Sequence, residues 1–300
     1  MADSIPQRLF VTGGRGRLAA LIAEHLHAPT HDLTLFSRQP GPGFRAMETL
    51  TAPGGLDEAG ALLHLAWSTL PANSELNPAA EIQHDLPLLK NLLEAVAATP
   101  KARRPHFIFF SSGGAIYGNA PGRPNVEADT CRPIGSYGRA KRAAEELIAT
   151  YASYHGLNCA VLRISNPYGY PVPSSRAQGL IPHALRCAVE GQTLTLWGDG
   201  SAKKDFLHFT DFLAALELVI SRRLTGTFNV CAGESHSVSE VIALVEQHTG
   251  RRVVVQAEPA RPWDVQDSRL DNSRFAAATG WQPLVGLDAG IRRAAAEYTR

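Results

Sequence analysis

The chain has 300 residues, of which 44% are hydrophobic and 19% are charged, and its net charge is +1. A chain of this size can bury one large core or two modest ones. It has no basic block and no interleaving of aromatic and basic residues, so neither nucleic acid nor a membrane surface is an expected partner. No apolar run reaches the roughly 18 residues of a membrane span, and residues 1–6 lack a signal pattern. We expect a cytoplasmic protein that binds a small molecule.

The cysteines are scattered, without a close pair and without the spacing of metal ligands. Such scattered thiols are typical of reduced, structural cysteines in the cytoplasm. No metal site is predicted. The four positions are Cys131, Cys159, Cys187 and Cys231.

The first predicted unit is a strand, a glycine turn and a helix. An apolar run at 9–12 ends at Gly13, and a helix-like stretch follows at 18–26. The spacing Gly13-x-x-Gly16-x-x-Ala19 allows a tight turn and a close approach of a pyrophosphate, whose charge the helix N-terminus attracts. A glycine pattern is weak by itself, but its place after the first strand favours a nucleotide. The predicted cofactor contacts are Gly13, Gly14, Arg15, Gly16, Arg17 and Leu18.

A second predicted strand, at 33–36, ends at Ser37 and Arg38. An acidic residue at this point accepts hydrogen bonds from the ribose 2′-hydroxyl of NAD, whereas arginine suits the 2′-phosphate of NADP. No acid stands at the strand end here, and Arg15 can reach the same phosphate. We therefore predict NADP as the cofactor, with NAD as the alternative and with Ser37 and Arg38 among the contacts. In the competing interpretation both arginines are simply solvated.

Alternation of strands and helices continues along the chain. Residues 39–60 are rich in proline and glycine, which predicts a short, irregular third unit. The alternation predicts an α/β protein with a Rossmann-type, doubly wound parallel sheet, with ligands at the carboxyl ends of the strands. Leu65 and Ala66 lie at such an end and are predicted cofactor contacts. The expected elements are a strand at 61–66, a helix at 81–98 despite Pro87, and a strand at 106–112.

Tyr137 and Lys141 lie four residues apart in a predicted helix that runs to about His155. Residues with this spacing share one helix face, so the hydroxyl and the ammonium can serve one site. A lysine held near a phenol lowers the pKa of the tyrosine, which makes Tyr137 a candidate proton shuttle. The alternative is a surface helix that happens to carry both residues.

The second half of the chain contains shorter elements, and prolines crowd the stretch after residue 165. We predict a dinucleotide-binding Rossmann domain at 1–165 and a smaller α/β substrate domain at 166–300, some segments of which return to the first domain. A substrate site between the two is the default expectation. The expected elements are strands at 158–164, 193–197, 227–230 and 253–256, and helices at 211–220, at 238–249 and from residue 288.

Taken together, the motifs resemble the extended short-chain dehydrogenase/reductase family, in its nucleotide-sugar epimerase/dehydratase branch, with a likeness to UDP-glucose 4-epimerases. The resemblance covers nearly the whole chain, and the ordered set of motifs is specific where each one alone is not. Its elements are the glycine turn, Phe-Phe-Ser-Ser-Gly-Gly-Ala-Ile-Tyr-Gly at 109–118, Tyr137 with Lys141, Arg-Ile-Ser-Asn-Pro-Tyr-Gly at 163–169, Gly-Asp-Gly-Ser-Ala-Lys-Lys-Asp-Phe at 198–206, and Arg-Pro-Trp-Asp at 261–264.

The resemblance implies a role for each matching residue. Tyr137 would exchange the proton of a sugar hydroxyl while the nicotinamide exchanges a hydride, and Lys141 would hold the nicotinamide ribose. Asn166 would contact the substrate near its diphosphate, and Arg261 and Asp264 would meet its nucleotide half. The resemblance also implies a homodimer. Gly113 and Lys204 complete the predicted substrate contacts.

This chain departs from the family pattern at a catalytic position and at a charged position. The usual catalytic serine or threonine stands where this chain has Gly113, and Ser112 is the neighbouring hydroxyl. Because one step along a strand reverses the side chain, Ser112 can replace it only if the chain has already left the strand. Lys204 stands for a common arginine, which keeps the charge but loses the bidentate fork.

The leading hypothesis is an epimerase of a nucleoside-diphosphate hexose, acting at C4 through a transient ketone. The alternative is an NADPH-dependent reductase of a nucleotide-linked 4-keto sugar, which the arginines near the second strand favour. A third hypothesis is a catalytically inactive member that only binds the cofactor, suggested by Gly113 and opposed by the intact Tyr137 and Lys141.

Overall fold

The computed structural model describes residues 7–26, 30–120, 122–170 and 179–298. The chain forms two compact units, each assembled from separate segments. The first unit contains residues 1–111, 135–162 and 216–227, and the second contains residues 112–134, 163–215 and 228–300. The domain boundary expected at residue 165 stays a prediction.

A seven-stranded sheet in the order β10-β6-β5-β4-β1-β2-β3 forms the framework of the first unit. The registered pairs β1–β2, β1–β4, β4–β5 and β2–β3 are all parallel, and the chain reverses its winding direction at β1. This confirms the doubly wound α/β prediction. The strands are β1 (Gln7–Thr12), β2 (His31–Ser37), β3 (Arg45–Ala46), β4 (Ala61–His64), β5 (His106–Ser112), β6 (Cys159–Ile164) and β10 (Gly226–Val230).

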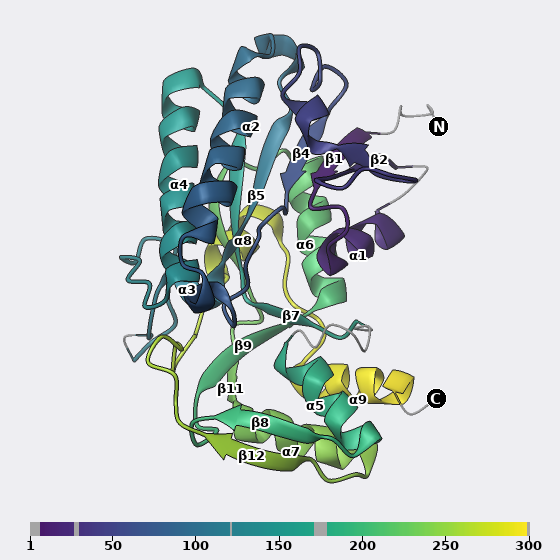
Figure 1. The fold of residues 1–300 in the computed structure, drawn as a ribbon, viewed down its shortest axis with the longest axis vertical. Coiled ribbons are helices and arrows are strands. Elements are labelled where there is room, and N and C mark those ends of the chain that lie inside the picture. The colour runs from purple at the N-terminus through teal and green to yellow at the C-terminus, as the bar shows by residue number, and fades with distance from the viewer. Residues whose placement is uncertain (1–6, 27–29, 121, 171–178, 299–300) are drawn as a thin grey trace. The chain divides into compact units, whose positions relative to one another are not determined.

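Two long helices, α2 and α4, lie side by side (Figure 1). The stretch predicted as one helix at 81–98 begins with a π-helical turn, η3 (Glu81–Asp85), before α2 (Leu86–Ala98). The N–H of Leu86 donates to the carbonyl of Glu81 in this wider turn, and Pro87, which has no N–H to donate, stands in the first turn of α2. The other helices are α1 (Arg17–His25), α3 (Gly113–Ile116), α4 (Ser136–His155) and α6 (Phe209–Ser221).

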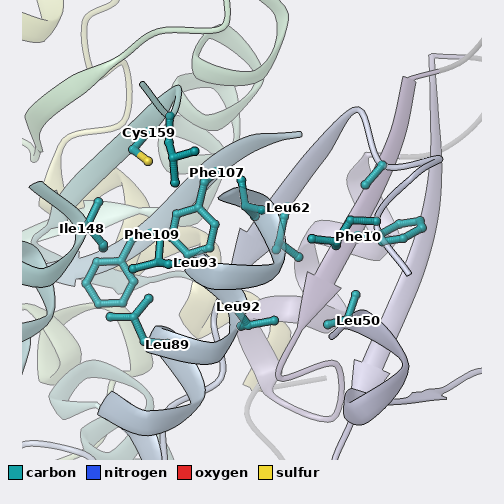
Figure 2. Packing of buried hydrophobic residues seen from close by; sticks show 14 of the residues in the cluster. Phe10, Leu50, Leu62, Leu89, Leu92, Leu93, Phe107, Phe109, Ile148 and Cys159 are labelled. Carbon is teal, nitrogen blue, oxygen red and sulfur yellow. The ribbon is translucent and has the colours of Figure 1, made fainter. Parts of the chain in front are cut away.

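Phenylalanine and leucine side chains fill the space between the sheet and α2 and α4 (Figure 2). Phe107 and Phe109 alternate along β5 and are fully buried, so the residue two further on, Ser111, faces the same layer. Burying each such apolar side chain contributes about 1.5–3 kcal/mol. The core thereby holds the carboxyl end of β5 against α4.

The second unit has a three-stranded sheet, β11-β9-β7, and a two-stranded parallel sheet, β12-β8. The helices α5, α7 and α9 contact one another around an apolar cluster that includes Tyr168 and Phe206. The elements are β7 (Asn166–Tyr168), α5 (Leu180–Glu190), β8 (Thr193–Trp197), β9 (Lys203–His208), β11 (Ser235–Ser237), α7 (Val238–Thr249), β12 (Val254–Glu258), α8 (Ser273–Thr279) and α9 (Leu287–Tyr298).

The elements not predicted from the sequence are α5, β7, β9, β11 and α8. Three of these are strands of three to six residues, too short to show a clear period. Much of the proline-rich stretch, at 171–178, lies outside the described residues. In the part of the chain that is described, no helix combines the length and apolarity needed to cross a membrane.

Candidate active site

The glycine turn fits tightly between the ends of two strands. Gly13 has φ +71°, and an added Cβ would lie 2.9 Å from the backbone nitrogen of Ala66. Gly14 donates from its backbone N–H to the carbonyl of Phe36 at 2.9 Å. The turn therefore lies beside the carboxyl ends of both β2 and β4, and only glycine fits at Gly13.

The N-terminal end of α1 follows directly on the glycine turn. Gly16 is the N-cap residue, and neither a capping side chain nor an acidic residue of the first turn occupies this end of the helix. The dipole of a helix attracts an anion at such an end. Arg17 forms an ion pair with Glu24 at 3.8 Å, and Leu18 is partly buried. The turn and helix end together fit the pyrophosphate of a dinucleotide.

Thr12 links the ends of β1 and β4. Its hydroxyl accepts hydrogen bonds from the backbone N–H groups of Leu65 and Ala66, both at 3.1 Å. It also lies 2.8 Å from Nδ1 of His64. Burial, together with the nearby charge of Lys141, lowers the pKa of His64 to about 3, so this imidazole is neutral. The contacts bring the predicted cofactor residues Gly13, Leu65 and Ala66 together.

Arginines surround the carboxyl end of β2. Arg15 donates to the carbonyl of Gln39 at 3.0 Å, and its guanidinium lies 4.4 Å from the ring centre of Phe44. Arg38 is exposed. Ser37 accepts from the backbone N–H of Gln39 at 3.2 Å, which leaves its own proton available. Among the described residues, neither Arg15 nor Arg38 has an acidic partner.

Arg45, at the start of β3, adds a third cation that the sequence analysis did not single out. Its guanidinium lies 5.5 Å from the ring centre of Phe36, the residue before Ser37. No acidic side chain in the described part of the chain pairs with it either. Arg45 is therefore a further guanidinium near the strand whose end Arg15 contacts through Gln39.

The helix α4 carries Tyr137 and Lys141 on one face, as the spacing predicted. The Lys141 Nζ lies 5.7 Å from the ring centre of Tyr137, and it donates to the carbonyl of Phe110 on β5 at 2.8 Å. It also lies 3.7 Å from the ring centre of Trp67, a cation–π contact. Lys141 is only 4% exposed and Tyr137 is partly buried, so neither side chain of the pair lies open to solvent.

The acid–base balance of this pair differs from the prediction. Burial lowers the pKa of Lys141 to about 7. Burial also raises the pKa of Tyr137 well above 10, and the negative charges of Glu81 and Asp85 raise it further. The net shift of the Tyr137 pKa is therefore upward in the protein by itself, opposite in direction to the effect expected of Lys141, because desolvation and the two carboxylates raise it.

Ser112 ends β5 in an extended conformation, with φ −131° and ψ 113°. Ser111 donates to Glu145 on α4, and strand alternation directs Ser112 to the opposite face. The chain has thus not left the strand at Ser112, and the condition for its replacing the family hydroxyl is not met. Its catalytic role stays a prediction without support from the backbone.

Gly113 is closely surrounded in the second unit. An added Cβ would overlap the side chain of Leu270 and would lie 3.1 and 3.2 Å from the carbonyl oxygens of Arg163 and Ile164. At Gly114 an added Cβ would instead make ordinary contacts of 3.6–3.9 Å with Asn166 and Ser268. The usual hydroxyl position is therefore filled by Leu270, a residue the sequence analysis did not identify.

The predicted substrate residues of the second unit fall into two groups. Asn166 and Gly113 form the first group, and Lys204, Arg261 and Asp264 form the second. Asn166 donates from its side chain to the carbonyl of Asp205 at 2.8 Å, beside Gly114. Lys204 donates to the carbonyl of Val265, and the charge of Asp264 partly offsets the lowering of the Lys204 pKa by burial.

Arg261 belongs to the second of these groups. Its carbonyl accepts from the Asp264 N–H at 3.1 Å, and its guanidinium stacks 3.7 Å from the ring centre of Trp197. Lys204, Arg261 and Asp264 therefore share one region, and Trp197 is an addition that no sequence motif indicated.

Comparisons with known proteins agree with this geometry. The sequence model of the NAD dependent epimerase/dehydratase family matches residues 9–231. The UDP-glucose 4-epimerase of Thermus thermophilus, solved as a complex with NAD, is 28% identical, with a TM-score of 0.86 over 97% of this chain and 99% of that one. The UDP-glucose 4-epimerase of Thermotoga maritima, solved with UDP-glucose, is 26% identical, with a TM-score of 0.86 over 97% and 98%. The dTDP-4-dehydro-6-deoxyglucose reductase of Escherichia coli is 29% identical over 77% of this chain and 72% of its own length.

The family match covers the glycine turn, both serines of β5 and the Tyr137–Lys141 pair. It extends well beyond half of the chain, and the fold agrees along nearly its whole length. The chain therefore belongs to the NAD-dependent epimerase/dehydratase family, whose members are enzymes of the extended short-chain dehydrogenase/reductase type.

Proposed function

We propose that the protein is a nucleotide-sugar epimerase that inverts C4 of a nucleoside-diphosphate hexose through a transient ketone. The observation that carries this proposal is the Tyr137–Lys141 pair on α4, with Lys141 tied to β5 through Phe110. Tyr137 takes the proton of the sugar hydroxyl and later returns it. Among the described residues no side chain hydrogen-bonds to the Tyr137 hydroxyl, so it is free to meet a substrate.

A bound nicotinamide dinucleotide would supply the acceptor and donor of the hydride in this reaction. The glycine turn and the first turn of α1 would hold its pyrophosphate. Lys141 would hold the nicotinamide ribose through the two N–H donors that Phe110 does not use. Leu65 and Ala66, fixed by Thr12, would line the same ligand.

We infer that NADP is the preferred cofactor, with NAD as the alternative. Arg15 and Arg38 lie at the end of β2 without acidic partners in the described part of the chain, and Ser37 has a proton to donate. Each charge-assisted hydrogen bond to a 2′-phosphate contributes about 1.5–3 kcal/mol. The NAD complex of the Thermus thermophilus relative supports the alternative.

For the substrate we propose residues 166–300 as mainly the nucleotide-sugar domain and residues 1–165 as the dinucleotide-binding domain. Asn166 and Gly113 would border the sugar diphosphate. Lys204, Arg261 and Asp264 would meet the nucleotide half, where guanidinium geometry suits phosphate. The Thermotoga maritima relative solved with UDP-glucose supports a nucleotide sugar as the ligand class.

We also propose a cytoplasmic homodimer. The four free cysteines support a reducing compartment. The homodimer rests on the family resemblance.

One experiment tests the function. The purified protein is incubated with UDP-, dTDP- and GDP-sugars, with and without NADPH, and the products are identified by mass and NMR. An epimerase gives a product of unchanged mass with inverted C4 and no net use of NADPH. Reduction of a 4-keto sugar with consumption of NADPH would favour the alternative, which the Escherichia coli reductase supports. No conversion of any substrate would favour the inactive, cofactor-binding member.

A further inference from the structure

A buried acidic residue, Asp85, lies next to the segment that covers Lys141. It ends the π-helical turn η3 and is 4% exposed. It accepts hydrogen bonds from the backbone N–H of Ser68 at 3.0 Å and from the Ser68 hydroxyl at 2.6 Å. Trp67, the residue before Ser68, packs its ring on the Lys141 ammonium. Asp85 is therefore linked to Lys141 through Ser68 and Trp67, and within the described part of the chain the two form no ion pair.

Lys141 needs a compensating charge because its surroundings are mostly apolar. The rings of Trp67 and Phe109 lie 3.7 and 4.6 Å from Nζ, and the Phe110 carbonyl is its one hydrogen-bond acceptor among the described residues. A buried ammonium with one acceptor tends to lose its proton.

The titratable groups that face Lys141 come from three elements. His64 on β4 is neutral, and Tyr137 and Glu145 lie on the same helix as Lys141. Glu145 accepts a hydrogen bond from Ser111. From η3 come Asp85 and Glu81, and the latter is fully buried, with Oε1 bonded to the hydroxyls of Thr69 and Ser74 and with Oε2 unpaired in the described structure.

We propose that Asp85 is a positioning residue that keeps the Lys141 ammonium protonated inside this apolar site. The proposal deepens the proposed function, since it rests on the need for a charged Lys141. Among the neighbouring carboxylates Asp85 is the one bonded to Ser68, which follows the Trp67 whose ring covers the ammonium, and its negative charge opposes the lowering of the Lys141 pKa by burial. The two Ser68 donors stabilise Asp85 as a carboxylate, although burial raises its pKa. Asp85 thus carries the charge that holds the proton on its neighbour.

The test is a direct titration of Lys141. The chain has only five lysines, so protein labelled with ¹³C at the lysine Cε position gives a short NMR spectrum, and Lys141→Arg assigns the signal. In Asp85→Asn the Lys141 pKa should fall by about one pH unit, the low end of the effect of one nearby opposite charge. Glu94→Gln is the matched control: this exposed acid of α2 pairs with Lys90 at 2.6 Å, so the Lys90 signal should move and the Lys141 signal should not.

Equal Lys141 titrations in the wild type and Asp85→Asn would overturn the proposal. If Asp85→Asn does not fold, Ser68→Ala decides, because losing one donor weakens the carboxylate form of Asp85 and must also lower the Lys141 pKa. Asp85→Glu should restore most of the wild-type titration, which a purely structural role of the Ser68 contact would not require.

The NMR titration does not depend on turnover, so it separates this proposal from the proposed function. Where turnover is measurable, the alkaline limb of the kcat profile should move to lower pH in Asp85→Asn by the same amount as the NMR titration. If the Lys141 pKa falls in Asp85→Asn but no sugar is converted, the effect of Asp85 on Lys141 is supported and only the proposed function is overturned.

Discussion

Restoring a hydroxyl at Gly113 should destabilise the protein rather than improve its chemistry. The Cβ of a serine at this position would lie less than 3.0 Å from Leu270, a separation that real Cβ atoms do not show. Leu270 is 1% exposed, so it has little room to move away. Overpacking of this kind costs about 1–3 kcal/mol, and we expect Gly113→Ser to lower the free energy of unfolding by that amount.

A double-mutant cycle tests this reasoning. Leu270→Ala alone should cost about 2–5 kcal/mol, the usual loss for such a core truncation. In Gly113→Ser/Leu270→Ala the serine occupies space that the alanine leaves, so the double variant should be about 1–2 kcal/mol more stable than the sum of the single effects predicts. Urea unfolding followed by far-UV circular dichroism measures all four proteins.

Gly114→Ser is the matched control, because an added Cβ there makes only ordinary contacts. It should change the free energy of unfolding by less than about 1 kcal/mol. Strict additivity in the cycle, or a Gly113→Ser protein as stable as Gly114→Ser, would refute the assignment of Leu270 to the hydroxyl position.

Other variants test the remaining roles. Tyr137→Phe should fold and bind cofactor yet lose at least about a hundredfold in kcat, because only the proton relay is removed; near wild-type turnover would exclude Tyr137 from the mechanism. Ser112→Ala should leave kcat within about twofold, because this serine faces away from the layer of Ser111; a loss of about a hundredfold or more, as for one transition-state donor, would reinstate it. Calorimetric titration should show NADP binding about tenfold or more tighter than NAD, and Arg38→Ala should erode that preference; equal or tighter NAD binding would contradict it.

The parts of the site that the sequence predicted depend on local rules. The glycine turn was predicted because a strand, closely spaced glycines and a helix follow one another directly in the chain. The shared face of Tyr137 and Lys141 follows from helix spacing alone. Arg15 reached the end of β2 as expected, because the turn and the strand end are neighbours in any sheet wound in this order.

The parts that the sequence did not predict depend on distant segments. Leu270 is more than 150 residues from Gly113, and nothing in either local pattern indicates that one fills the space beside the other. The direction of the Tyr137 pKa shift was also not predicted, because it too depends on residues from distant segments. The spacing of Tyr137 and Lys141 predicts their distance but not the desolvation that governs both pKa values, and desolvation depends on Trp67 and Phe109 from other elements.

The surroundings of Tyr137 and Lys141, and not only the distance between them, determine the pKa values of both side chains. Burial lowers the pKa of Lys141 to about 7, close to neutral pH, and a tyrosine with a raised pKa does not ionise there unaided. In the proposed function, proton transfer at Tyr137 would therefore depend on every charge that enters or borders the site. Asp85 favours the charged lysine and at the same time opposes ionisation of Tyr137. A positively charged nicotinamide ring would act on Tyr137 in the opposite direction, which couples the readiness of the base to the oxidised cofactor rather than to Lys141 alone.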